Sequence, residues 1–146
     1  MSDVVHLAKR FAGSLSRTPP AADDEAWAET WLSPGEVALW RTMSNVDRRH
    51  AIEVARRFRA LRPDAPAAEM AGALLHDVGK VESGLGTWGR VVATVVGPRT
   101  PRFRTYHDHE AIGARWLDAA GAAAATVELV HRRGPAAAAL EAADDI

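Results

Sequence analysis

The sequence predicts an all-α protein, folded as a single-domain helical bundle of about six or seven helices. Apolar residues recur at the three- and four-residue spacing of helices along most of the 146-residue chain. Strand-like segments are few, and the alanine-rich segments 122–125 and 136–139 favour helix intrinsically. A chain of this length suits one domain with one core.

Residues 1–45 are expected to form an N-terminal helical extension, and residues 46–146 the main domain. The first dozen residues have the spacing of an amphipathic helix, and the Ser- and Pro-containing segment 13–22 indicates a mobile linker. Ser33 followed by Pro34 is typical of a helix start, so another helix is expected there.

Two helices of the main domain carry polar residues beside their apolar faces. In the helix predicted over 47–61, His50 lies one turn before a buried-type valine and so adjoins the apolar face. For the next helix, Asp64 is the expected N-cap and Gly79 the expected C-terminal stop. The pair His76-Asp77 should then lie in its last turn.

Three or four further helices follow. The segment 88–96 has a helical stripe, although its valines suit a strand equally well. The next helix should close at Gly121, and the one after it at the Gly-Pro pair 134–135. The segment 137–144 forms the last helix.

Composition excludes several classes of protein. The formal net charge is −1, so no bulk charge predicts nucleic-acid or membrane binding, and no basic stripe with interleaved aromatics indicates a nucleic-acid polymer. Cysteine is absent, which excludes disulfides, thiolate metal sites and cysteine catalysis. The chain start lacks the apolar run of a secretory signal, and no stretch is long enough to span a membrane, so a cytoplasmic location is expected.

Charge is unevenly placed along the chain. The segment 23–40 has five acidic residues and no Lys or Arg, whereas the segment 90–104 has four arginines and no acid. Either these are solvated surface patches, or the basic segment lies near an anionic substrate.

Six residues fit one divalent-metal centre. Each lies within a helical pattern and close to its apolar stripe, where a polar side chain is costly to bury unless something pairs with it. Imidazole and carboxylate are ligands of Fe, Mn, Zn and Mg, and a carboxylate beside a histidine can bridge two ions. The six residues are His50, His76, Asp77, His109, His131 and Asp144.

The segment 74–80, LLHDVGK, resembles the signature of the HD-domain superfamily of metal-dependent phosphohydrolases. His50 resembles the first metal-binding histidine of that family. His109, four residues before a glycine, is similar to the additional histidine of its two-metal members, and His131 to the histidine that follows. The resemblance covers about residues 46–145.

Asp144 resembles the closing aspartate of the family, and is preferred to Asp145 because it lies one turn beyond Leu140 and matches the family's Ala-Asp pattern. The resemblance implies two ions, bridged by Asp77. The first would be held by His50, His76, Asp77 and Asp144, and the second by His109 and His131. Fe or Mn is favoured, with Mg, Zn, Co and Ni as alternatives.

By the same resemblance, a metal-activated hydroxide attacks a phosphoryl group, with Asp77 and Lys80 as the catalytic residues. Lys80 follows the HD pair closely and is assigned to the substrate phosphate as a point charge. Weaker candidates for binding that phosphate are Arg49, Arg90 and Arg132. The expected partner is a small anionic phosphorylated substrate.

Three functions follow from these residues. The leading one is hydrolysis of a phosphate ester or anhydride, with a nucleotide as one candidate substrate. A di-iron oxygenase similar to the inositol oxygenases is an alternative, because histidine and carboxylate suit iron as well as manganese. The third is a non-catalytic module that binds a nucleotide or a partner protein.

Overall fold

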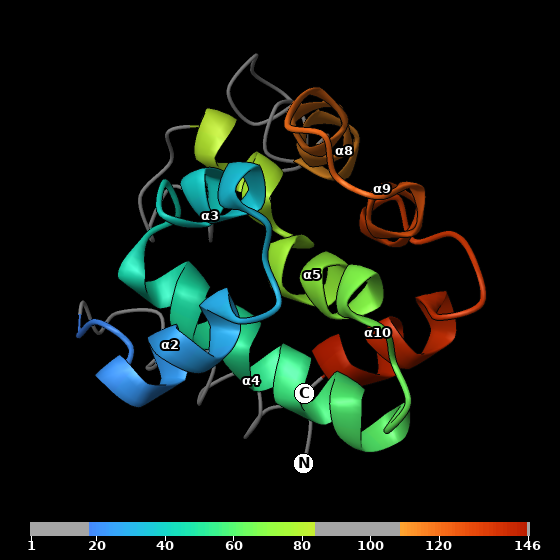
Figure 1. The fold of residues 1–146 in the computed structure, drawn as a ribbon, viewed down its shortest axis with the longest axis horizontal. Helices are drawn as coiled ribbons and strands as arrows, with labels where there is room; N and C mark the ends of the chain where they lie inside the picture. Colours follow the sequence, from blue (N-terminus) through green and yellow to red (C-terminus); the bar gives the residue numbers. More distant parts are fainter. Residues whose placement is uncertain (1–17, 84–108, 146) are drawn as a thin grey trace, which may run out of the picture.

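The computed structural model describes residues 18–83 and 109–145, and this part of the chain is helical without strands. It contains seven α-helices and one short 3-10 helix, η1 (Figure 1). The prediction of an all-α, single-domain bundle is therefore confirmed. The elements are α2 (Ala22–Glu29), α3 (Pro34–Trp40), α4 (Asn45–Leu61), α5 (Ala67–Leu75), η1 (Val78–Ser83), α8 (His109–Ala119), α9 (Ala124–Val130) and α10 (Ala137–Asp144).

Several predictions fall outside the described residues. They are the helix in the first dozen residues, the start of the linker, the segment 88–96 and the arginines of 90–104. Among the described helices, none combines the length and apolar character needed to cross a membrane.

The core lies between α4, α5 and the C-terminal helices. α5 packs against α4 and α9, and α10 lies along α4 (Figure 1). Burying one large apolar side chain stabilises the fold by about 1.5–3 kcal/mol, so these contacts hold the helices firmly in place. This packing brings α4, the end of α5 and the end of α10 together. Fully buried side chains of these three helices include Val54, Phe58, Leu74, Leu75 and Leu140.

The two N-terminal helices share this core. Ala28 of α2 and Trp40 of α3 are fully buried in the same apolar cluster as α4 and α5. The predicted helix start at Ser33-Pro34 is confirmed, because Ser33 and Glu36 cap each other's backbone N–H groups. The division into a 1–45 extension and a 46–146 domain stays a prediction.

Two predicted boundaries around α5 were wrong. Pro66, not Asp64, occupies the N-cap, because the residue before a proline is disfavoured in helical conformation and the helix can begin only after it. α5 ends at Leu75, so the pair His76-Asp77 lies in the turn after the helix, with His76 as its C-cap. Gly79 does not stop α5, since it lies inside η1 and its φ is not positive.

The boundary of α9 also differs from the prediction. α8 closes at Gly121, as expected, with a left-handed φ of 79°. α9 closes at Arg132 rather than at Gly134, since Arg132 itself takes the left-handed conformation with a φ of 58°. The sequence pattern pointed to the glycine two residues beyond the true closing position.

Candidate metal centre

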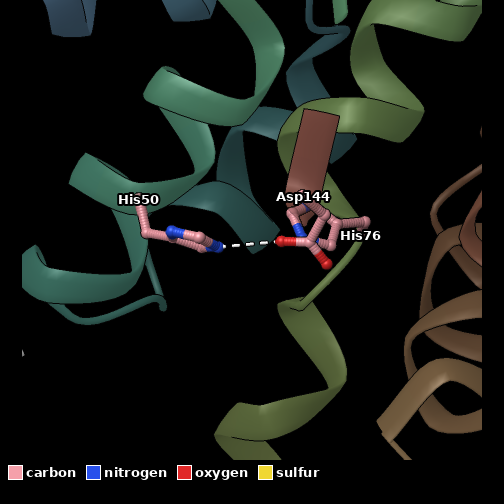
Figure 2. A group of neighbouring side chains, drawn as sticks. All are labelled: His50, His76 and Asp144. Carbon is pink, nitrogen blue, oxygen red and sulfur yellow. Dashed lines mark hydrogen bonds and ion pairs between the residues drawn. The ribbon is translucent and has the colours of Figure 1, made fainter. Parts of the chain in front are cut away.

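Three of the predicted ligands converge at one point in the fold. His50 comes from α4, His76 from the turn after α5, and Asp144 is the last residue of α10. One ligand atom from each lies within 4.8 Å of the other two. Figure 2 shows the ring of His50 directed at the Asp144 carboxylate, with His76 beside it. The Nε2 atom of His50 lies 3.0 Å from Oδ1 of Asp144, and Nε2 of His76 lies 3.5 Å from the same oxygen.

His76 is fully buried and held in one orientation. Its Nδ1 lies 2.6 Å from the carbonyl oxygen of Ala73, and because a carbonyl only accepts, Nδ1 donates. The opposite ring nitrogen, Nε2, is also buried and finds no hydrogen-bond partner among the described residues. It faces Oδ2 of Asp77 at 3.2 Å as well as Asp144. A histidine anchored through Nδ1 to a backbone carbonyl, with Nε2 aimed at carboxylates, has the usual arrangement of a metal ligand.

The charges around His76 favour a cation at this point. Burial alone would lower the pKa of His76, but the carboxylates of Asp77 and Asp144, which face its Nε2, outweigh burial and raise the pKa to about 10. Burial would likewise raise the pKa of Asp144, but its hydrogen bond to His50 and the nearby positive charge of His76 hold that pKa far below the ordinary value. His76 therefore tends to hold a proton on Nε2, and a metal ion that binds this atom would have to displace that proton.

Asp77 borders the three-residue group through His76. The side chain of Asp77 is nearly buried, and its Oδ2 also accepts a hydrogen bond of 3.0 Å from Nζ of Lys80. The backbone N–H of Lys80 donates to the carbonyl of Asp77, so η1 fixes the two residues relative to each other. Gly113 of α8 lets the helix approach this turn, since a Cβ there would meet the backbone nitrogen of Gly79 at 3.1 Å.

Asp144 is shared between the histidines and an arginine. Its Oδ1 faces His50 and His76, and its Oδ2 accepts a hydrogen bond of 2.9 Å from Nη2 of Arg132. The neighbouring Asp145 is exposed and lies outside the group of mutually close ligand atoms. Asp144 is thus held from both sides.

The other predicted site residues lie elsewhere or are not described. His131 is half-buried at the C-cap of α9 and does not belong to the group found among the described residues. His109 begins α8, but its side chain lies outside the described residues, as does Arg90. Arg49 is half-buried on α4, next to His50 in the sequence.

A solvent-open hollow of about 510 Å³ gives access to Asp144. Sequence reasoning did not assign the acidic residues that line it beside Asp144. The sequence marks two of them only by their positions. Glu110 follows His109, and Glu141 shares the face of α10 that carries Asp144. The lining residues are Glu110, Arg132, Glu141, Asp144 and Asp145.

Comparison of the chain with protein-family models, with curated proteins and with solved structures finds no match. The interpretation of the site therefore rests on the chemistry of its own residues.

Proposed function

We propose that this protein is a metal-dependent phosphohydrolase of the HD type, which hydrolyses a phosphate ester or anhydride of a small molecule. The observation that carries the proposal is the convergence of His50, His76 and Asp144, whose ligand atoms lie within 4.8 Å of one another, with Asp77 3.2 Å from the buried Nε2 of His76. Two carboxylates beside a buried ring are costly to hold unless a positive charge offsets them, and a bound metal cation would supply that charge.

The donor set fits a divalent metal of the first transition row. Two imidazole nitrogens and one carboxylate oxygen leave coordination positions open, as a catalytic site requires, and Asp77 adjoins the group at 3.2 Å from His76. A metal held there supplies Lewis-acid charge and a water of lowered pKa. The proposal includes a second ion, which His109 and His131 would hold together with Asp77, and Fe or Mn is the favoured element.

Two cations of this chain contact the carboxylates of the site and would bind the phosphoryl group in this proposal. Lys80 contacts Asp77 at 3.0 Å, and Arg132 contacts Asp144 at 2.9 Å. Both can exchange a carboxylate oxygen for a phosphate oxygen, Lys80 as a point charge and Arg132 as a planar fork. Arg49 and Arg90 are weaker candidates for the same contact.

In the proposed reaction, water adds to phosphorus and the bond from phosphorus to the leaving oxygen breaks. The leaving oxygen takes up a proton, so the products are inorganic phosphate, or a shortened phosphate, and the alcohol or phosphate it was joined to. Lys80 and Arg132 would offset the charge that develops on the phosphoryl oxygens.

The test combines metal analysis with a broad panel of phosphate esters and anhydrides. Purified protein should contain or bind a divalent metal and release phosphate from at least one class of substrate. His76→Ala should lose both properties, whereas Asp145→Asn should keep the metal. Metal-replete protein that releases phosphate from no member of the panel would contradict the proposal. Oxygen uptake by an iron-loaded sample would support the oxygenase instead, and metal binding that only raises the melting temperature would support the non-catalytic module.

A further inference from the structure

The ligand Asp144 lies at a vulnerable place in its helix. α10 has only eight residues, and Asp144 is the last of them. The final carbonyl groups of a helix have no partner inside it, so the last turn tends to fray. Its last turn carries no basic residue to interact favourably with the negative end of the helix dipole. Something outside α10 must therefore keep Asp144 in place.

His50 and Arg132 contact the carboxylate itself, and Arg57 of α4 supplies a contact to the backbone beside it. Its Nε donates a hydrogen bond of 3.0 Å to the carbonyl oxygen of Ala143, the residue immediately before Asp144. Arg57 lies seven residues after His50, and hence about two helical turns further along the same face of α4. One helix face thus carries a metal ligand and a side chain that grips the helix end bearing another ligand, as α10 lies along α4 (Figure 1).

We propose that Arg57 is a positioning residue, which holds the Ala143–Asp144 peptide so that the Asp144 carboxylate meets His50 and His76. This inference rests on the proposed metal centre. Arg57 acts through the backbone and touches neither metal nor substrate. Its guanidinium also places a positive charge at the C-terminal end of α10, which its own sequence lacks.

A purely stabilising role is the alternative, and α4 offers a matched control for it. Arg56 precedes Arg57 and also makes a side-chain hydrogen bond, of 2.7 Å to Asp24. Its guanidinium stacks 4.2 Å from the ring centre of Trp27. These contacts fasten α2 and not α10. Arg56→Gln therefore removes a charged contact from the same helix without touching the helix end that bears Asp144.

The experiment measures Mn²⁺ affinity by titration calorimetry for the full chain and for Arg57→Gln, Arg57→Lys and Arg56→Gln, together with melting temperatures. Arg57→Gln should weaken Mn²⁺ binding about tenfold, the lower end of the usual effect of residues that support metal ligands. Arg57→Lys keeps the charge and should recover part of the affinity. Arg56→Gln should bind Mn²⁺ as the wild type does, even where its melting temperature falls.

Hydrogen exchange of the metal-free proteins provides a second readout. Because the hydrogen bond of Arg57 restrains the end of α10, backbone amides of residues 143–145 should exchange several-fold faster in Arg57→Gln, and at wild-type rates in Arg56→Gln. This measurement can also be made at low temperature, for a variant whose melting temperature is too low for the Mn²⁺ titration.

Folded Arg57→Gln with wild-type Mn²⁺ affinity, or equal losses in Arg57→Gln and Arg56→Gln, would overturn the inference while leaving the proposed function intact. Mn²⁺ binding that follows the expected order without any phosphate release would support the inference and overturn the hydrolase. A wild-type chain that binds no Mn²⁺ would overturn both.

Discussion

The ends of α8 and α9 form the same turn with different residues at its critical position. After α8, the N–H of Gly121 donates to Asp118 and that of Ala122 to Leu117, at 3.1 and 2.9 Å. After α9, the N–H of Arg132 donates to Leu129 and that of Arg133 to Glu128, at 2.8 and 2.9 Å. This pair of hydrogen bonds defines the Schellman motif, in which one residue adopts left-handed backbone.

The left-handed residue is Gly121 in the first turn and Arg132 in the second. Glycine takes this conformation without a steric penalty, whereas a residue with a Cβ pays about 1–2 kcal/mol. The strained turn is the one at the candidate metal centre, since the Arg132 side chain reaches Oδ2 of Asp144. Backbone strain of this kind tends to persist at functional sites. Glycine would form the same turn without strain. We infer that arginine occupies position 132 because its side chain contacts Asp144.

The largest expected effect comes from removing the group that Arg132 contacts. Asp144→Asn eliminates the carboxylate shared by His50, His76 and Arg132, so Mn²⁺ affinity should fall about 100-fold or more, beyond the tenfold typical of supporting residues. Titration calorimetry checks this. Asp145→Asn is the control one residue away, and a similar loss of affinity in both variants would contradict the assignment of Asp144.

The second effect is a dependence of stability on pH at the candidate metal centre, through His76 and Asp144. The raised pKa of His76 contributes stability to the metal-free protein that is complete below about pH 6.5 and is lost as pH rises through about 10. The lowered pKa of Asp144 contributes stability present above about pH 4 and lost on further acidification. Both shifts describe the same ion pair.

Urea unfolding of the metal-free wild type should therefore give a lower free energy at pH 10 than at pH 6. Asp144→Asn should flatten this slope, because it removes one of the two carboxylates that hold the proton on His76. An equally steep slope in that variant would mean that His76 and Asp144 are not coupled.

The third effect separates two properties of Arg132, the strain of its left-handed backbone and the contact of its side chain with Asp144. Arg132→Gly should weaken Mn²⁺ binding about tenfold, because Asp144 loses the partner of its Oδ2. Its free energy of unfolding should change by less than about 1 kcal/mol, since relief of the left-handed strain offsets the lost ion pair. A variant that binds Mn²⁺ like the wild type would show that Arg132 does not support the ligand.

The smallest effect is the reverse substitution in the other turn. Gly121→Ala introduces the same strain without a compensating contact, and a Cβ at this position would meet no described atom within 4 Å. The free energy of unfolding should fall by about 1 kcal/mol, or the melting temperature by about 3 °C, with Mn²⁺ affinity unchanged. Unchanged stability would imply that the left-handed conformation carries little strain in this protein.

Sequence patterns predicted the features that depend on local periodicity and on residue type. The all-α class, the start of α3 at Ser33-Pro34 and the closure of α8 at Gly121 follow from helical spacing and turn chemistry. The convergence of His50, His76 and Asp144 was anticipated because polar side chains beside apolar stripes must meet a partner when the stripes pack together.

Features that depend on tertiary geometry could not be predicted in this way. No residue pattern marks Arg132 as left-handed, since its conformation follows from where α9 ends, and the nearby Gly134 was the more typical stop. The partner of Arg57 is a backbone carbonyl, which has no identity in the sequence. The position of His131 outside the group depends on its place at the C-cap of α9, where a shift of one residue turns a side chain by about 100°.

The most direct test is anomalous X-ray diffraction from crystals grown with Mn²⁺. Imidazole and carboxylate ligands bind transition metals at about 2.0–2.2 Å. We expect an anomalous peak at that distance from Nε2 of His76, from Nε2 of His50 and from Oδ1 of Asp144. A Mn²⁺ ion bound only elsewhere, with His76 Nε2 still facing the two carboxylates, would contradict the account.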